Sequence, residues 1–307
     1  MTLLAIVLVL LSAVIHASWN LLGKRNTGSG VAFSLAASGS AALLLSPFLL
    51  WYLFTIGWDT LSPAFWQLLL ISGLCQLIYL VGLLVAYQHG DIGLIYPIAR
   101  ALPVLMVGGI TRWLGLSLDN LQWLGFVLIT IGCLIVPLSS FRQLSRAAYC
   151  NLGVGWALIA ALGTTGYSVV DKAAMALLTE LVHTLISDPL SALFYLGMQF
   201  WAMVLPLLLG IAVYAGIQRT RGHHTAILAQ TWQLRRNATL AGSMMAMTYG
   251  LVLFAMTMTD NVSLIVALRQ FSIVVGLIMG TLFLKEKWYI TRGVGVAAIL
   301  GGILLTL

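Results

Sequence analysis

The sequence predicts an all-α integral membrane protein with ten transmembrane helices, arranged as two inverted five-helix repeats. Three observations predict this class. Of the 307 residues, 61% are hydrophobic and only 7% are charged, with a mean hydropathy of +1.04. The apolar residues gather in ten runs of membrane-spanning length, and the second half of the chain repeats the first. Because soluble domains carry about 25% charged residues, a soluble fold could not cover its surface with so few charges.

Polar or turn-forming segments separate the ten apolar runs. Each run approaches or exceeds the roughly 20 residues that a membrane-spanning helix needs, and none alternates strictly like a barrel strand. The first run has no Lys or Arg before it and is too long for a signal peptide, so we interpret it as a span. We expect spans at 2–22, 31–56, 64–88, 92–112, 121–138, 151–170, 190–216, 238–258, 262–284 and 288–307.

The two halves of the chain align over short stretches of similar sequence. Residues 13–24 align with 161–172, and residues 90–103 align with 259–272, which pairs Arg100 with Arg269. These alignments predict a first domain at 1–140 and a second at 151–307, each a five-helix repeat. Because five is odd, successive repeats enter the membrane in opposite orientations, as in many secondary transporters.

The formal net charge of +7 has a simple origin in a membrane protein. Cytoplasmic loops of such proteins collect Lys and Arg, so the excess does not require a nucleic-acid partner. Most of the basic residues follow odd-numbered spans, among them Lys24, Arg142, Arg219 and Lys285. The positive-inside rule, taken alone, therefore predicts that both termini lie outside the cell.

Several motifs are similar to those of a known transporter family. They are IHASWNLLGK in the first span, GYSVVDK in the sixth, AYQHGDIGLIYPIARALP across the third and fourth, and LFLKEKWYITRGVGVAAILGGILL at the end. Over essentially its whole length the chain resembles the ten-span EamA-like members of the drug/metabolite transporter superfamily. One departure is that Glu286, between the last two spans, is matched in the first half only by Asp119. The resemblance implies a multi-pass transporter of the cell (inner) membrane, with both termini cytoplasmic, in contrast to the charge pattern.

Arg100 and Arg269 are the most informative residues. Each lies seven or eight residues into its expected span, roughly 11–12 Å deep at the rise of a helix. A charge at that depth costs at least about 2.5–3.5 kcal/mol. All eight acidic residues are expected at span ends or in the breaks, so neither arginine has a carboxylate at its own depth. The arginines either face a wet cavity that attracts an anion, or bond helix-end carbonyls or reach Asp91 or Asp260 by snorkelling.

Further candidate binding residues surround the two arginines. Tyr96 lies one turn before Arg100, where both could contact one ligand. The first span carries a polar stripe whose alternative role is hydrogen bonding between helices, and Trp19 beside it could simply fill space. We expect the substrate site to use His16, Trp19, Asn20, Tyr79, Tyr96, Arg100, Tyr167, Arg269 and Gln270.

The pattern favours a secondary active transporter, an exporter or exchanger, of a small polar metabolite that is anionic or zwitterionic. An amino acid or an organic or phosphorus-containing acid would fit, carried by alternating access around a central cavity. The sequence has no P-loop, and the expected partners are a small-molecule substrate and the lipid bilayer, with no nucleic acid, cofactor or metal. Glycines in the fifth and tenth spans leave a homodimer open.

Two other classes of function remain as alternatives. One is a non-transporting membrane assembly or lipid-flipping subunit, which would show no saturable uptake. The other is an intramembrane enzyme, which would need an acid–base constellation or metal ligands at membrane depth. The expected spans offer His16 at depth but no carboxylates, so we expect that the protein is not an enzyme.

Overall fold

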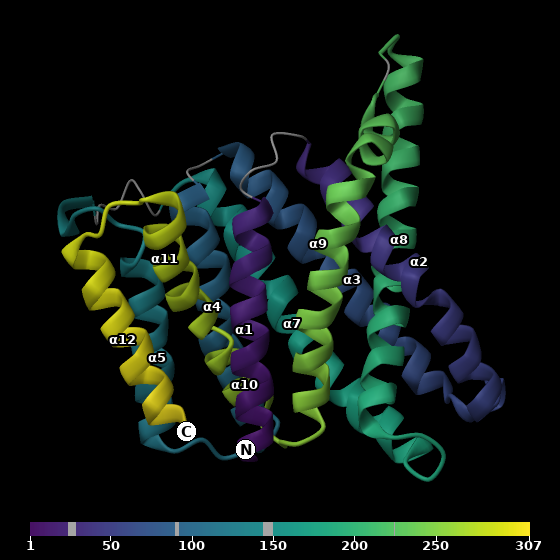
Figure 1. Cartoon of the computed structure of the whole chain (residues 1–307), viewed down its shortest axis with the longest axis horizontal. Coiled ribbons are helices and arrows are strands. Elements are labelled where there is room, and N and C mark those ends of the chain that lie inside the picture. Colours follow the sequence, from purple (N-terminus) through teal and green to yellow (C-terminus); the bar gives the residue numbers. More distant parts are fainter. Residues whose placement is uncertain (24–28, 90–91, 144–149, 224) are drawn as a thin grey trace.

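The structure is a computed structural model that describes residues 1–23, 29–89, 92–143, 150–223 and 225–307. The described part is helical and contains no strand, which confirms the predicted all-α class (Figure 1). Short 3₁₀ turns lie at Trp58–Thr60 and Phe141–Gln143. The helices are α1 (Leu3–Gly23), α2 (Gly30–Ile56), α3 (Pro63–His89), α4 (Ile92–Trp113), α5 (Asn120–Ile135), α7 (Leu152–Val182), α8 (Asp188–Thr220), α9 (Ile227–Met256), α10 (Val262–Leu268), α11 (Phe271–Leu284) and α12 (Ile290–Thr306).

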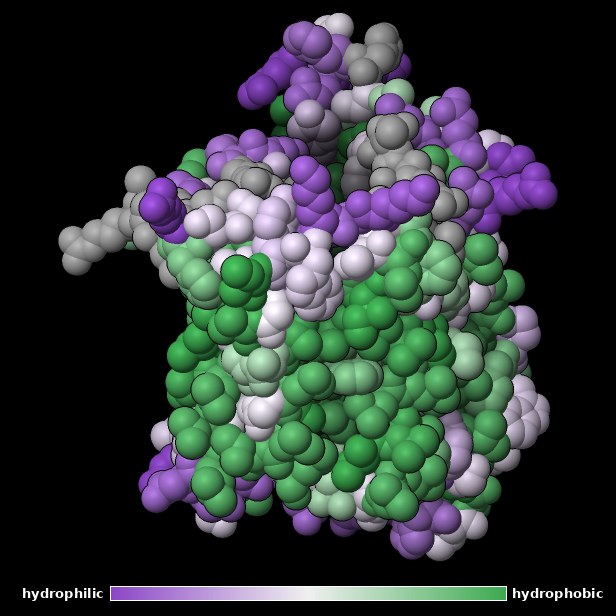
Figure 2. Space-filling model, turned by 60° about the vertical axis from the view of Figure 1, so that its left-hand side comes forward, coloured by the Kyte–Doolittle hydropathy of each residue, from purple (hydrophilic) through white to green (hydrophobic). Residues whose placement is uncertain are grey.

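A broad apolar band crosses the visible face of the molecule between two hydrophilic ends (Figure 2). Large apolar side chains are exposed on several helices, including Phe54 at 74% exposure and Leu304 at 73%. Such a surface suits the hydrocarbon of a bilayer rather than water. Six spans in the described part are long and apolar enough to cross a membrane: Gly30–Ile56, Pro63–His89, Leu152–Val182, Asp188–Thr220, Ile227–Met256 and Val262–Phe283.

The two ends of the helical bundle differ in charge. Both chain termini lie at the same end, which we call the acidic end because its turns carry Asp59, Asp119, Asp188 and Asp260 (Figure 1). The opposite end, which we call the basic end, holds the turn between α8 and α9 and the turn between α11 and α12. Its described basic residues include Arg219, Arg221, Lys285, Lys287 and Arg292.

Helix α7 is longer than the apolar run that predicted it. The sixth span was expected to end at residue 170, with a break at 171–189, but the helix continues to Val182. The added residues, DKAAMALLTELV, are mostly strong helix formers, and the next proline is Pro189. Asp171 therefore lies inside a helix with no exposed surface. The prediction that every acidic residue lies at a span end or in a break is wrong.

Other boundaries also depart from the apolar runs. Helix α9 begins at Ile227, well before the expected start at residue 238. The ninth expected span is divided into α10 and α11 by a tight turn at Arg269 and Gln270. There the backbone N–H of Gln270 bonds the carbonyl of Ala267, and that of Ser272 bonds the carbonyl of Arg269. Hydrogen bonds between residues three positions apart are typical of a 3₁₀ turn, which is tighter than an α-helix. Arg269 therefore lies at the break between α10 and α11.

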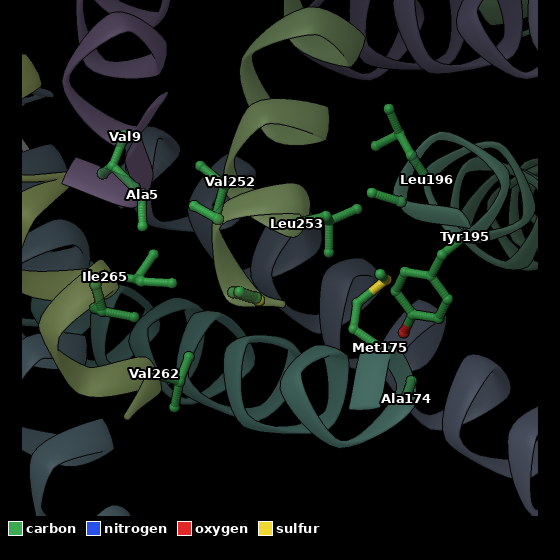
Figure 3. Packing of buried hydrophobic residues seen from close by; sticks show 14 of the residues in the cluster. Ala5, Val9, Ala174, Met175, Tyr195, Leu196, Val252, Leu253, Val262 and Ile265 are labelled. Carbon is green, nitrogen blue, oxygen red and sulfur yellow. The ribbon is translucent and has the colours of Figure 1, made fainter. Parts of the chain in front are cut away.

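The largest apolar cluster joins helices from both halves of the chain. Figure 3 shows side chains from α1, α7, α8, α9 and α10 meeting near the acidic end, among them Val9, Met175, Leu253 and Ile265. This packing fixes α7, α8 and α9 around the space that the next section describes.

Glycines allow α5 and α12 to approach each other closely. A Cβ atom at Gly302 would lie 2.6 Å from the carbonyl oxygen of Gly125, and one at Gly132 would lie 2.6 Å from that of Gly295. The close contact expected from these glycines is therefore made between α5 and α12 of one chain. These glycine faces are covered within the chain, so they are not available to a partner subunit.

Gly302→Ala should destabilise the protein, because the added methyl group has no room against α5. We expect a loss of about 1–3 kcal/mol in the free energy of unfolding, measured by SDS titration in mixed micelles. Gly301→Ala is the matched control, since a Cβ at Gly301 meets nothing within 4 Å. Equal stability of the two variants would contradict the packing described for α5 and α12.

The charge difference between the two ends predicts the orientation in the membrane. In a Cys150→Ser background, a cysteine at exposed Asp59 should react with an impermeant thiol reagent added to intact cells. A cysteine at exposed Arg221 should be protected until the cells are opened. The reverse pattern of labelling would place the termini in the cytoplasm, as the family resemblance implies.

Candidate functional site

A cavity of about 150 Å³ lies among the helices of both halves. Its wall combines basic, aromatic, amide and apolar side chains from most of the helices. The lining residues are His16, Ser34, Ser38, Gln76, Tyr79, Leu80, Arg100, Tyr167, Leu196, Gln199, Phe200, Met203, Met245, Thr248, Tyr249 and Arg269. We call this space the central cavity.

Arg100 reaches the central cavity from α4 and is only 8% exposed. Its guanidinium donates to Nε2 of His16 and to Oγ of Ser272, each over 2.9 Å. Because a guanidinium can only donate, Nε2 of His16 acts as the acceptor, which assigns the proton of a neutral imidazole to Nδ1. The Nε of Arg100 is buried without a hydrogen-bond partner. Arg100 therefore retains an unused buried donor beside its two neutral partners.

Arg269 enters the cavity from the turn between α10 and α11. Its guanidinium carbon lies 5.3 Å from the ring centroid of Tyr249, and the hydroxyl of Tyr167 interacts with it. Tyr79, Tyr167 and Tyr249 form an edge-to-face series, with centroids 6.2 Å and 5.8 Å apart. Cation–π contact and phenol oxygens partly compensate the buried charge but do not neutralise it.

Asp171 forms a second polar centre behind the cavity wall. It accepts hydrogen bonds from the hydroxyls of Ser72, Tyr195 and Tyr249 and from the amide of Gln199. The Tyr195 bond spans 2.8 Å, and the two Gln199 bonds span 2.8 and 2.7 Å. These donors satisfy the oxygens of the carboxyl group and offset the cost of burying them. Gln199 and Tyr249 also line the central cavity, so Asp171 fixes two of its wall residues.

A second, larger cavity of about 550 Å³ lies toward the basic end. Glu286, Lys287 and Arg292 line its outer part, where Arg292 is paired with Glu286 over 3.2 Å. His16 lines both cavities, whereas Arg100 lines the central one and Ser272 lines the second. The bridge from His16 through Arg100 to Ser272 therefore separates the two spaces.

The central cavity brings together five of the residues expected in the site: His16, Tyr79, Arg100, Tyr167 and Arg269. Tyr96 lines the second cavity instead, with its ring centroid 5.9 Å from the Arg100 guanidinium carbon. Gln270 is buried and lines neither cavity; its amide donates to the Val266 carbonyl over 3.0 Å. The side chains of Trp19 and Asn20 fall outside the described part of the structure.

Several residues of the site were not among the expected ones. Gln199 and Thr248 line the cavity, Ser272 binds Arg100, and Ser72 and Tyr195 bind Asp171. Spacing could have found some of them. Tyr195 and Gln199 lie four residues apart in an otherwise apolar run, and Tyr167 and Asp171 have the same spacing on α7, which places each pair on one helix face.

The described side chains include no group of three or more His, Cys, Asp or Glu residues that could hold a metal ion. The polar groups that line the central cavity are two guanidiniums, an imidazole, amides and hydroxyls. These groups can bind an anion, since most are hydrogen-bond donors and two carry a positive charge.

Comparisons with known proteins bear on the fold alone. No family model matches the chain, and no curated protein matches it. The chain is similar to a solved crystal structure, described only as that of a protein, with a TM-score of 0.61 and 13% sequence identity. The similarity covers 98% of this chain and 96% of the other. The helical arrangement is thus shared along nearly the full length of both proteins.

Asp171→Ala should destabilise the protein strongly, because it leaves several buried donors without an acceptor. We expect a loss of about 3 kcal/mol or more, since each orphaned buried donor costs about 1–3 kcal/mol. The control is Glu180→Gln, an exposed acidic residue on the same helix, which should change stability little. A loss below about 1 kcal/mol for Asp171→Ala in a thermal or SDS titration would contradict the network.

Proposed function

We propose that the protein is a secondary active transporter, an exporter or exchanger, of a small anionic or zwitterionic metabolite. The observation that carries the proposal is the pair of arginines on the wall of the central cavity. In the described part of the structure, neither guanidinium forms an ion pair with a carboxylate within 4 Å.

The electrostatic balance favours a bound anion. A buried cation is costly unless it is paired, and neutral donors and rings offset only part of that cost. Arg100 retains a buried Nε without a partner, and Arg269 is held mainly by tyrosines. A carboxylate or phosphate group between them would form charge-assisted hydrogen bonds with both.

The helix packing supports ten spans in two inverted repeats, with α10 and α11 together as the ninth span. In such an arrangement each contact between two helices has a counterpart between the two helices that correspond to them in the other repeat. The contact of α3 with α7 corresponds to that of α9 with α1, and the contact of α4 with α7 corresponds to that of α11 with α1. Each arginine also reaches the first helix of its own half, where Arg100 meets His16 and Arg269 meets Tyr167.

The two cavities support alternating access between the repeats. A transporter of this kind opens its binding site to one side of the membrane at a time. Here the bridge of His16, Arg100 and Ser272 closes the central cavity from the cavity at the basic end. An anion that competes for the Arg100 guanidinium would weaken this bridge, which links substrate binding to opening.

We also assign the chain to the ten-span EamA-like members of the drug/metabolite transporter superfamily, located in the cell (inner) membrane. The motifs around Arg100 and the glycine-rich last span support this assignment.

Arg100→Gln and Arg269→Gln should each reduce transport by at least about tenfold, the effect of losing one charge-assisted hydrogen bond. The measurement is saturable flux of radiolabelled L-phenylalanine, 3-phenylpropionate, succinate and inorganic phosphate into proteoliposomes. Arg112→Gln is the control, since Arg112 is exposed in the last turn of α4.

Wild-type flux in both cavity variants would contradict the proposed role of the arginines. Saturable flux of none of the four probes through folded wild-type protein would contradict the transport function. That second outcome would instead favour an assembly or lipid-flipping subunit.

A further inference from the structure

We propose that the central cavity takes a small carboxylate with an apolar, ring-sized body and no ammonium group. This inference rests on the transport function proposed above and narrows its substrate class from anions and zwitterions to net anions. Three features of the cavity carry it: the charges on its wall, the distribution of its apolar side chains and its volume.

Among the described residues, the lining of the central cavity carries positive charge without an acidic side chain. Arg100, Arg269 and His16 contribute the ionisable basic groups, and no Asp or Glu of the described part lines the cavity. An α-ammonium group lies one carbon away from its carboxylate, so a zwitterion held by the arginines would place a third positive charge beside them. Like charges a few ångströms apart repel inside a protein, so the ammonium group of a zwitterion would weaken its binding.

Asp171 cannot supply the missing negative contact in this structure. Its side chain has no exposed surface, and both of its oxygens accept hydrogen bonds from Gln199, while Tyr195 and Tyr249 each donate to one of them. Gln199 and Tyr249 line the cavity, whereas Asp171 does not. An ammonium group could reach the carboxylate only by displacing the donors that stabilise its burial.

Three of the five aliphatic or phenyl side chains that line the cavity come from α8, on the side away from α4. Leu196, Phe200 and Met203 come from α8, which packs on α2, α3, α7 and α9. Arg100 comes from α4, which packs on α3, α5, α7 and α10. Figure 1 shows α4 and α8 on opposite sides of α1 and α9. The cavity is therefore amphipathic, with a charged end toward α4 and an apolar end toward α8.

The size of the cavity limits the apolar body of the ligand. Its volume is about 150 Å³, and an apolar cavity of about this volume accommodates one benzene molecule. The edge-to-face series of Tyr79, Tyr167 and Tyr249 between the two ends offers aromatic faces and edges to such a ring. A carboxylate on a single ring matches the charge of the wall, and the ring alone accounts for the volume of the cavity.

A matched pair of ligands tests this inference directly, because 3-phenylpropionate and L-phenylalanine differ only by the α-ammonium group. Isothermal titration of the purified protein in detergent should give an affinity for 3-phenylpropionate at least tenfold higher than for L-phenylalanine. Acetate, which keeps the carboxylate and lacks the ring, should also bind at least tenfold more weakly. Phenethylamine, which lacks the carboxylate, should not compete.

Two variants separate the charged end from the apolar end. Arg269→Gln should weaken binding of 3-phenylpropionate and of acetate alike. Phe200→Leu keeps a folded apolar wall and should weaken only 3-phenylpropionate, by about threefold to tenfold. The ratio between the two ligands is the readout, so a uniform loss caused by poorer folding would not be mistaken for the predicted result.

The outcomes distinguish this inference from the transport function. L-phenylalanine that binds as tightly as 3-phenylpropionate overturns the inference and leaves an anion-or-zwitterion transporter in place. Binding or flux of succinate or phosphate without 3-phenylpropionate also overturns it alone. Absence of binding and of flux for every probe, with folded protein, overturns both.

Discussion

The burial of two guanidinium groups among neutral partners is the constraint on which the rest of the site depends. Arg100 is held by His16 and Ser272, and Arg269 by Tyr167 and Tyr249. These contacts orient the arginines toward one cavity but leave its charge uncompensated. The two arginines would be neutralised by a negative charge on a bound ligand, which is why we propose that the site binds an anionic metabolite.

Asp171 contributes to this arrangement without entering the cavity. It accepts a hydrogen bond from Tyr249, whose ring lies against the Arg269 guanidinium. It also accepts one from Gln199, another residue of the cavity wall. The carboxyl group of Asp171 thus lies behind the wall, while the guanidinium groups lie on it.

Much of the fold was predictable from the sequence, because apolar runs of membrane-spanning length are a strong signal. The site was predictable where a charged residue stands out in such a run, as Arg100 and Arg269 do. Asp171 was missed because the apolar run ends at residue 170 whereas the helix continues to Val182. Hydropathy indicates contact with lipid and does not report which helices pack on one another. Gln199 and Ser272 were missed because they bind Ser72 and Arg100, which lie on helices distant in sequence.

The most direct test of the central claim is the distance between a bound carboxylate and the two guanidiniums. Solid-state NMR of the reconstituted protein can measure it with ¹³C-carboxyl 3-phenylpropionate and ¹⁵N-labelled arginine. The account predicts dipolar contacts to two guanidiniums within about 4 Å, the separation in a charge-assisted hydrogen bond, with one lost in Arg100→Gln and the other in Arg269→Gln. A saturably bound ligand whose carboxyl carbon shows no contact with either arginine would contradict it.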